Sequence, residues 1–107
     1  MCQFFAGQPR WNYELEKRSV RLGGHSTSIQ LENIFWQILE EIAAAEDLSV
    51  AKFIIKLHDE VVLAHGEARN FASLLRCCCL IYLDRKNGVA GPRFGPPNRT
   101  ADMAAAQ

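Results

Sequence analysis

The chain has 107 residues, and 12 basic side chains balance 12 acidic ones, so the formal net charge is zero. This length suits a single domain with one modest core. Because its charges balance, the chain is not strongly basic, and its net charge alone does not indicate nucleic-acid binding. No apolar run approaches the roughly 18 residues needed to cross a membrane, and the first residues lack a signal-peptide pattern. We therefore expect a cytoplasmic protein without membrane contact.

The charges are nevertheless segregated along the chain. Residues 17–31 carry three cations and no acid, whereas residues 32–67 carry eight acids against two lysines. The cationic segment therefore gives one region of the fold a basic character that the net charge hides.

The first 16 residues form an arm rich in large aromatic side chains, namely Phe4, Phe5, Trp11 and Tyr13. Rings of this size are costly to leave in water. We therefore expect residues 1–16 to pack on the domain.

Two short segments after the arm have the alternation of strands. His25–Leu31 alternates polar and apolar residues, and so does Arg18–Leu22. Gly23-Gly24 between them suits a two-residue hairpin turn. One interpretation is therefore a local hairpin.

A second interpretation pairs His25–Leu31 with the same segment of another copy, antiparallel across a two-fold axis. This would satisfy the edge of a strand that otherwise has no obvious partner. The two arrangements can coexist because a strand has two edges. We favour the intermolecular ribbon, which makes the protein an obligate homodimer with the option of higher assembly.

Three helices are expected after the strand. The first runs from about Glu32 to Glu46, with an apolar face that includes Ile38, Leu39 and Ile42. Ser49 is a good N-cap for the second, which begins at Val50 and ends near His65-Gly66, where glycine suits a C-terminal cap. Residues 70–83 form the third helix, and the segment 88–107, rich in Gly, Pro and Ala, is expected to be a disordered tail.

Neither a metal site nor a catalytic site is expected. Three of the four cysteines are consecutive, Cys77 to Cys79, so their side chains point about 100° apart on a helix and cannot converge on one ion. They suit packing better. His58 and His65 lack a third ligand. No nucleophile–base pair stands out either, so we expect no cofactor and no enzymatic activity.

The stretch Thr27-Ser28-Ile29-Gln30-Leu31-Glu32-Asn33-Ile34-Phe35-Trp36 carries a TS-x-x-LE-x-x-FW pattern, and Asn70–Arg76 an N-x-x-S-x-L-R pattern. These patterns resemble the ribbon-helix-helix superfamily, and more narrowly a small bacterial family of stand-alone members predicted to bind DNA. The resemblance covers about residues 17–83. It implies a mainly α-helical fold with one strand, two helices and, here, an additional third helix.

The resemblance also implies where DNA would be contacted. Ile29 and Leu31 continue the helical core, so Ser26, Ser28 and Gln30 point outward, and these correspond to the base-contacting positions of the superfamily. Gln can contact adenine, and Ser suits either type of base edge. Arg18 and Arg21 are candidate phosphate contacts.

Superfamily members also hold a phosphate on the backbone amides that begin the second helix. Here that contact falls on Ser49 and Val50, with Lys52 adding charge. The alternative is that Ser49 only caps its helix.

The function that this predicts is a sequence-specific transcriptional regulator, most simply a repressor, whose dimeric β-ribbon enters the major groove of double-stranded DNA. The rival hypothesis is an antitoxin-like module that binds a partner protein through the third helix and the tail. Its acidic helices and zero net charge favour that rival.

Overall fold

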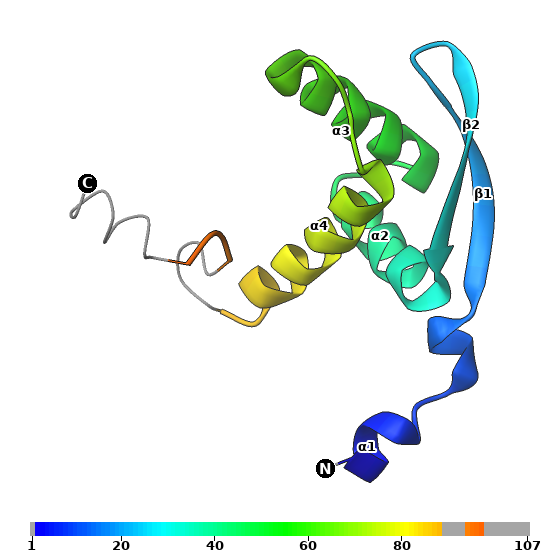
Figure 1. The fold of residues 1–107 in the computed structure, drawn as a ribbon, viewed down its shortest axis with the longest axis vertical. Coiled ribbons are helices and arrows are strands. Elements are labelled where there is room, and N and C mark those ends of the chain that lie inside the picture. Colours follow the sequence, from blue (N-terminus) through cyan, green and yellow to red (C-terminus); the bar gives the residue numbers. More distant parts are fainter. Residues whose placement is uncertain (1, 89–93, 98–107) are drawn as a thin grey trace.

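The computed structural model describes residues 2–88 and 94–97, so most of the expected tail, 88–107, lies outside the described residues. A two-stranded sheet stands beside a group of three helices, and a short N-terminal arm extends from the end of the hairpin where β1 begins (Figure 1). The elements in chain order are α1 (Cys2–Ala6), the 3-10 turn η1 (Arg10–Tyr13), β1 (Leu15–Leu22), β2 (His25–Glu32), α2 (Asn33–Ala45), α3 (Val50–His65) and α4 (Phe71–Lys86).

The strand of residues 25–32 finds its partner within its own chain. β1 pairs antiparallel with β2 over its whole length, from Leu15 opposite Glu32 to Leu22 opposite His25. Gly23 and Gly24 make the two-residue turn with φ of 58° and 84°, a conformation that glycine adopts without the penalty of a Cβ.

The hairpin confirms the local interpretation, whereas the preference for an intermolecular ribbon stays a prediction, because one chain does not show the pairing of copies. That preference depends on His25–Leu31 having no obvious partner, but β1 begins at Leu15, three residues earlier than the alternation at Arg18 indicates. The longer β1 satisfies one edge of β2 completely. The other edge of β2 stays available for a second copy, so the homodimer stays a prediction.

The core lies between the inner face of the hairpin and the helices. Each strand turns two apolar side chains inward, Val20 and Leu22 from β1 and Ile29 and Leu31 from β2. They meet the buried side chains Trp36, Leu39, Ile42, Ile54, Leu75 and Cys79 from α2, α3 and α4. α3 packs against β1 and α4 packs against β2. α2 contacts both α3 and α4.

The helix boundaries agree closely with the sequence patterns. The side chain of Ser49 accepts a hydrogen bond from the amide of Lys52 at 3.2 Å, and Gly66 ends α3 with a φ of 83°. α4 begins after Asn70 and continues to Lys86, one turn beyond the expected Leu83, where Lys86 pairs with Glu41 of α2 at 2.6 Å. None of the described helices is long and apolar enough to cross a membrane.

The aromatic arm divides into two parts. η1 lies against α2, and the carbonyl of Glu14 accepts a hydrogen bond from the amide of Asn33 at 2.8 Å. Neither η1 nor α1 has a buried residue: Trp11 and Tyr13 are 49% and 55% exposed, and Phe4 and Phe5 are 78% and 58% exposed. η1 thus contacts α2 with its rings about half exposed, and the packing of the whole arm on the domain stays a prediction.

Candidate nucleic-acid interface

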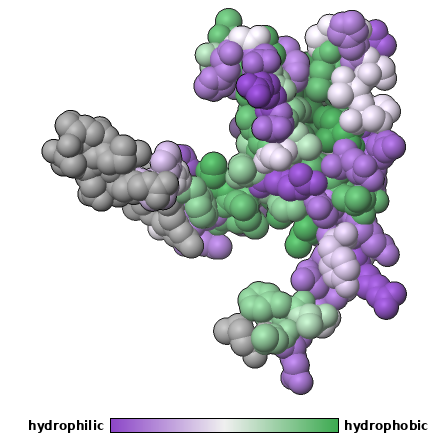
Figure 2. Space-filling model, in the orientation of Figure 1, coloured by the Kyte–Doolittle hydropathy of each residue, from purple (hydrophilic) through white to green (hydrophobic). Residues whose placement is uncertain are grey.

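The outer face of the hairpin is a continuous polar surface. The register places three cross-strand pairs on it: Lys17 opposite Gln30, Ser19 opposite Ser28, and Arg21 opposite Ser26. All six residues are exposed. No acidic residue occurs between positions 17 and 30, so this face carries two formal positive charges and no negative one. Polar residues dominate this side of the molecule in Figure 2.

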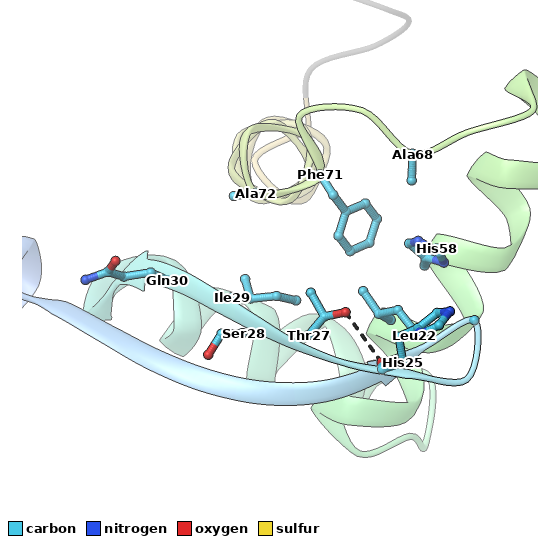
Figure 3. A pocket seen from close by; sticks show the side chains of 11 residues that line it. Leu22, His25, Thr27, Ser28, Ile29, Gln30, His58, Ala68, Phe71 and Ala72 are labelled. Atoms are coloured by element: carbon cyan, nitrogen blue, oxygen red, sulfur yellow. Dashed lines mark hydrogen bonds between the residues drawn. The ribbon is translucent and has the colours of Figure 1, made fainter.

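The alternation argument placed the β2 residues correctly. Ile29 is 5% exposed and Leu31 is fully buried, whereas Ser26, Ser28 and Gln30 are exposed. Ser28 points away from the side of the strand that carries Ile29 and Thr27 (Figure 3). Short hydroxyls and one amide on a flat ribbon can donate to and accept from base edges.

Two residues of this face, Lys17 and Ser19, were not among the site residues predicted from the sequence. The signal was present, because a two-residue turn at Gly23-Gly24 fixes the register and places Lys17 opposite Gln30. A strand that starts at Arg18 leaves Lys17 outside it. The face therefore has the cation that the β2 positions alone lack.

Arg21 and Arg18, both expected to contact phosphate, lie on opposite sides of β1. Arg21 points outward, and one terminal nitrogen of its guanidinium donates to the carbonyl of Gly24 at 3.0 Å. Arg18 is on the inner side, where its guanidinium lies 4.5 Å from the centre of the Trp36 ring and donates to Glu40 at 3.0 Å. The same alternation that selects the outward β2 residues assigns Arg18 to the inner row with Val20.

Arg18 belongs to a set of contacts that holds β1 to α2. It also donates to Glu16 at 2.5 Å, and the indole of Trp36 donates to the Glu16 carbonyl at 2.9 Å. The Arg18 side chain is one-third exposed. Its charge is already paired with two carboxylates, so Arg18 is less available to an added anion than Lys17 or Arg21.

The beginning of α3 has the groups needed to hold an anion. α3 begins beside the hairpin and ends away from it (Figure 1), in keeping with its contact with β1. The Ser49 hydroxyl accepts a hydrogen bond from the Lys52 amide, so Ser49 caps the helix. The amides of Val50 and Ala51 lie in the first turn, where an α-helix offers no internal acceptor for them. They form part of the positive end of the helix dipole.

The packing predicted for the three consecutive cysteines holds for Cys79, which is buried, and in part for Cys78, whereas Cys77 is exposed. Burial raises the pKa of the Cys79 thiol to about 12, so it stays protonated at neutral pH. Its sulfur lies 3.6 Å from the carbonyl of Phe35, to which it donates. In residues 2–88 and 94–97, no three His, Cys, Asp or Glu side chains are grouped so that they could hold a metal ion.

Comparison with known proteins identifies the family. The model of the ribbon-helix-helix domain matches residues 15–83, which is the span from the first residue of β1 to the last turn of α4. The chain therefore belongs to the ribbon-helix-helix family, whose members are generally DNA-binding regulators.

A solved structure is also similar. It is that of an uncharacterized protein from Bordetella pertussis Tohama I, which is 40% identical, with a TM-score of 0.78, and the match covers 92% of this chain and 81% of that one. No curated protein matches. The match therefore extends beyond residues 15–83, and the name of that protein describes no function.

Proposed function

We propose that this protein is a sequence-specific DNA-binding regulator that inserts its hairpin into the major groove, with the outer face of β1 and β2 toward the bases. The observation that carries the proposal is the acid-free outer face, with Lys17 and Arg21 flanking the hydroxyls and the amide. Membership of a family of DNA-binding regulators supports it. Such a role belongs in the cytoplasm, and repression by occupying a promoter is its simplest form.

The hairpin fills the groove by itself in this proposal. The major groove admits a two-stranded ribbon. Since β1 and β2 are already two strands, adding a second copy's strands to the free edge of β2 would make a sheet too wide to enter. Each copy therefore contacts its own half-site. Two copies related by a two-fold axis would occupy half-sites about 34 Å apart on a pseudo-palindrome.

The contacts divide by role. Gln30, Ser28 and Ser26 contact base edges, with Ser19 beside them, while Lys17 and Arg21 contact phosphates at the edges of the groove. The amides of Val50 and Ala51, after the Ser49 cap, hold a further phosphate with Lys52 adjacent. Arg18 contributes indirectly by holding β1 against α2.

The proposal predicts that Lys17→Ala/Arg21→Ala weakens binding to a short mixed-sequence duplex and lowers the salt dependence of log K by about 2, because about two phosphate contacts are lost. Fluorescence anisotropy at several salt concentrations measures this.

Gln30→Ala should instead relax the preference for one base pair, by about 1–3 kcal/mol. Selection of bound sequences from a random duplex library measures this preference.

Arg69→Ala/Arg85→Ala is the matched control, since it removes the same charge from exposed residues outside the hairpin. If this control lowers affinity and salt slope as much as Lys17→Ala/Arg21→Ala, binding follows net charge and the hairpin face is not the contact surface.

A partner-protein role is the second candidate, and one feature of α4 favours it. α4 is apolar on nearly all sides: Leu75 and Cys79 are buried, yet Leu80 and Ile81 remain 52% and 42% exposed. A helix of this kind usually has neighbours around it. Binding to such a partner would depend little on salt, whereas DNA binding falls steeply with it.

A further inference from the structure

The N-terminal arm, residues 2–13, exposes large aromatic side chains. Neither of its two helical segments has a buried residue. Four rings lie close together in the sequence and are each at least 49% exposed, namely Phe4, Phe5, Trp11 and Tyr13. Figure 2 shows an apolar group at the tip of the arm, separated from the main group of helices by polar residues. Apolar surface gathered in this way marks a contact site.

The charge of the arm indicates the kind of partner. Residues 2–13 contain no acidic residue and one exposed cation, Arg10. The first acids, Glu14 and Glu16, lie at the root of the arm, and Glu16 is paired with Arg18. The arm also carries three amide side chains, those of Gln3, Gln8 and Asn12. Aromatic rings combined with a cation and amides, without carboxylates, suit contact with the bases and phosphates of nucleic acid.

The arm continues the face of the hairpin that is proposed to contact DNA. On β1 the outward row that includes Lys17 ends at Leu15, which is 54% exposed, and the arm precedes it directly. The root of the arm is fixed, because the Glu14 carbonyl accepts a hydrogen bond from the Asn33 amide at 2.8 Å. Beyond this root the arm extends past the end of the hairpin and away from α3 and α4 (Figure 1). A duplex on the outer face of the hairpin is therefore within range of the arm.

The length of the arm suits a neighbouring groove. From its root to its tip the arm spans about 26 Å when the linker is extended, given the rise of a 3-10 turn, of three extended residues and of a short α-helix. The major groove is about 12 Å wide and the minor groove about 6 Å. An arm of this length can cross one phosphate backbone and enter the minor groove beside it.

We propose that the arm is a second DNA-contacting element, which inserts Phe4 and Phe5 into the minor groove next to the hairpin. Arg10 contacts a phosphate of the backbone that the arm crosses. The two rings meet edge to face, with 5.2 Å between their centroids and 77° between their planes. One ring therefore enters a base step while the other packs against the sugars. This inference rests on the proposed contact between the hairpin and DNA.

The inserted rings add a sequence requirement outside the bases that the hairpin contacts. An apolar wedge unstacks a base step, and pyrimidine–purine steps such as TA and CA unstack most easily. The preferred site therefore has such a step at a fixed distance from the bases under the hairpin. The bound duplex is kinked at that step by about 20–90° toward the major groove.

Selection of bound sequences from a random duplex library tests the requirement. The parent should enrich a pyrimidine–purine step beside the central preference. Phe4→Ser/Phe5→Ser should keep the central preference, which belongs to the hairpin, and lose the flanking one. This variant should unfold in urea as the parent does, because α1 has no buried residue. Leu63→Ser is the matched control: it removes an 89% exposed apolar side chain from α3 and should select as the parent does.

Energy transfer between dyes at the two ends of a duplex recovered with the parent measures the bend. The parent should raise the transfer on binding. Phe4→Ser/Phe5→Ser should leave the duplex straighter and bind it roughly tenfold more weakly, because the contacts of the rings with the bases are lost. If this variant bends the duplex and selects sequences as the parent does, the arm is not a DNA contact and the inference is wrong.

The remaining outcomes separate this inference from the proposed function. If Lys17→Ala/Arg21→Ala weakens binding while Phe4→Ser/Phe5→Ser behaves as the parent, the hairpin contacts DNA and only the arm inference fails. It fails also if the Phe variant binds DNA normally but differs from the parent in sedimentation or in binding to phosphatidylglycerol vesicles. The rings then cover a second copy or a membrane surface. If the parent binds no duplex, both proposals fail.

Discussion

At the residue scale, Trp36 does most to hold the candidate interface in shape. Its side chain is 1% exposed, its indole donates to the Glu16 carbonyl at 2.9 Å, and its ring carries the Arg18 guanidinium at 4.5 Å. One side chain of α2 therefore fixes the backbone of β1 and orders a cation on it. The outward direction of Lys17, which lies between Glu16 and Arg18, depends on this arrangement.

We predict that Trp36→Phe lowers the free energy of unfolding by about 1–3 kcal/mol, because an aromatic ring is kept while the partly buried hydrogen bond to the Glu16 carbonyl is lost. Urea denaturation of the full chain measures the change. Trp11→Phe is the control, since Trp11 is 49% exposed and should shift stability by less than about 0.5 kcal/mol. A Trp36→Phe variant as stable as Trp11→Phe would show that the Glu16 hydrogen bond contributes little.

Glu32 and Arg76 form the second contact that decides local structure. The Arg76 Nε donates to the Glu32 carboxylate at 2.8 Å, which joins the end of β2 to α4, and both side chains are about 30% exposed. The hydrogen bond from Arg76 is the main cause that lowers the pKa of Glu32 below its ordinary value of 4.5. Both residues lie in the two patterns that resemble the family.

The lowered pKa predicts a pH dependence. Because the folded state favours the charged carboxylate, the stabilisation is present above pH 4.5 and is lost as the pH falls through the lower folded value. Relative to Glu32→Gln, the parent should therefore be more stable by about 0.5–1 kcal/mol at pH 6, and the difference should shrink as the pH falls below 4.5 and the carboxylate is protonated.

Thermal or urea unfolding at several pH values measures this difference, and Arg76→Gln should remove the same dependence from the other side. If Glu32→Gln and the parent lose stability in parallel as the pH falls, the ion pair contributes nothing to folding.

At the scale of elements, the sequence predicted the helices well because their signals are local. The apolar spacing, the Ser49 cap and the glycine after His65 each act within one or two turns, and α2, α3 and the start of α4 follow them closely. The pairing of β2 was harder, since the choice between a neighbouring strand and a second copy depends on the start of β1. No strong sequence pattern indicates that β1 starts at Leu15.

The candidate site was predicted in part for the same reason. Alternation alone placed Ser26, Ser28 and Gln30 outward, and the structure has them exposed. It could not supply Lys17 and Ser19 until the register was known. For α1 the hydrophobicity of Phe4 and Phe5 predicted burial, but both rings are exposed in the structure, and composition does not reveal which surface would cover them.

At the scale of the whole molecule, three surfaces have different chemistry. The outer face of the hairpin is polar and cationic, the arm exposes aromatic rings, and the outer side of α4 exposes Leu80 and Ile81. Zero net charge is consistent with DNA binding here because acids gather on the helices and are absent between residues 17 and 31. Approach to DNA should then be governed by the hairpin side.

In the proposed function, the outer face of one chain's own hairpin contacts DNA. Titration of the ¹⁵N-labelled full chain with a short duplex, followed by amide chemical shifts, tests it most directly. We expect the largest changes on residues 17–21 and 26–30, with a second group at Val50 and Ala51. Largest changes on α4 or on the Phe4–Phe5 arm, with the hairpin unaffected, would contradict it.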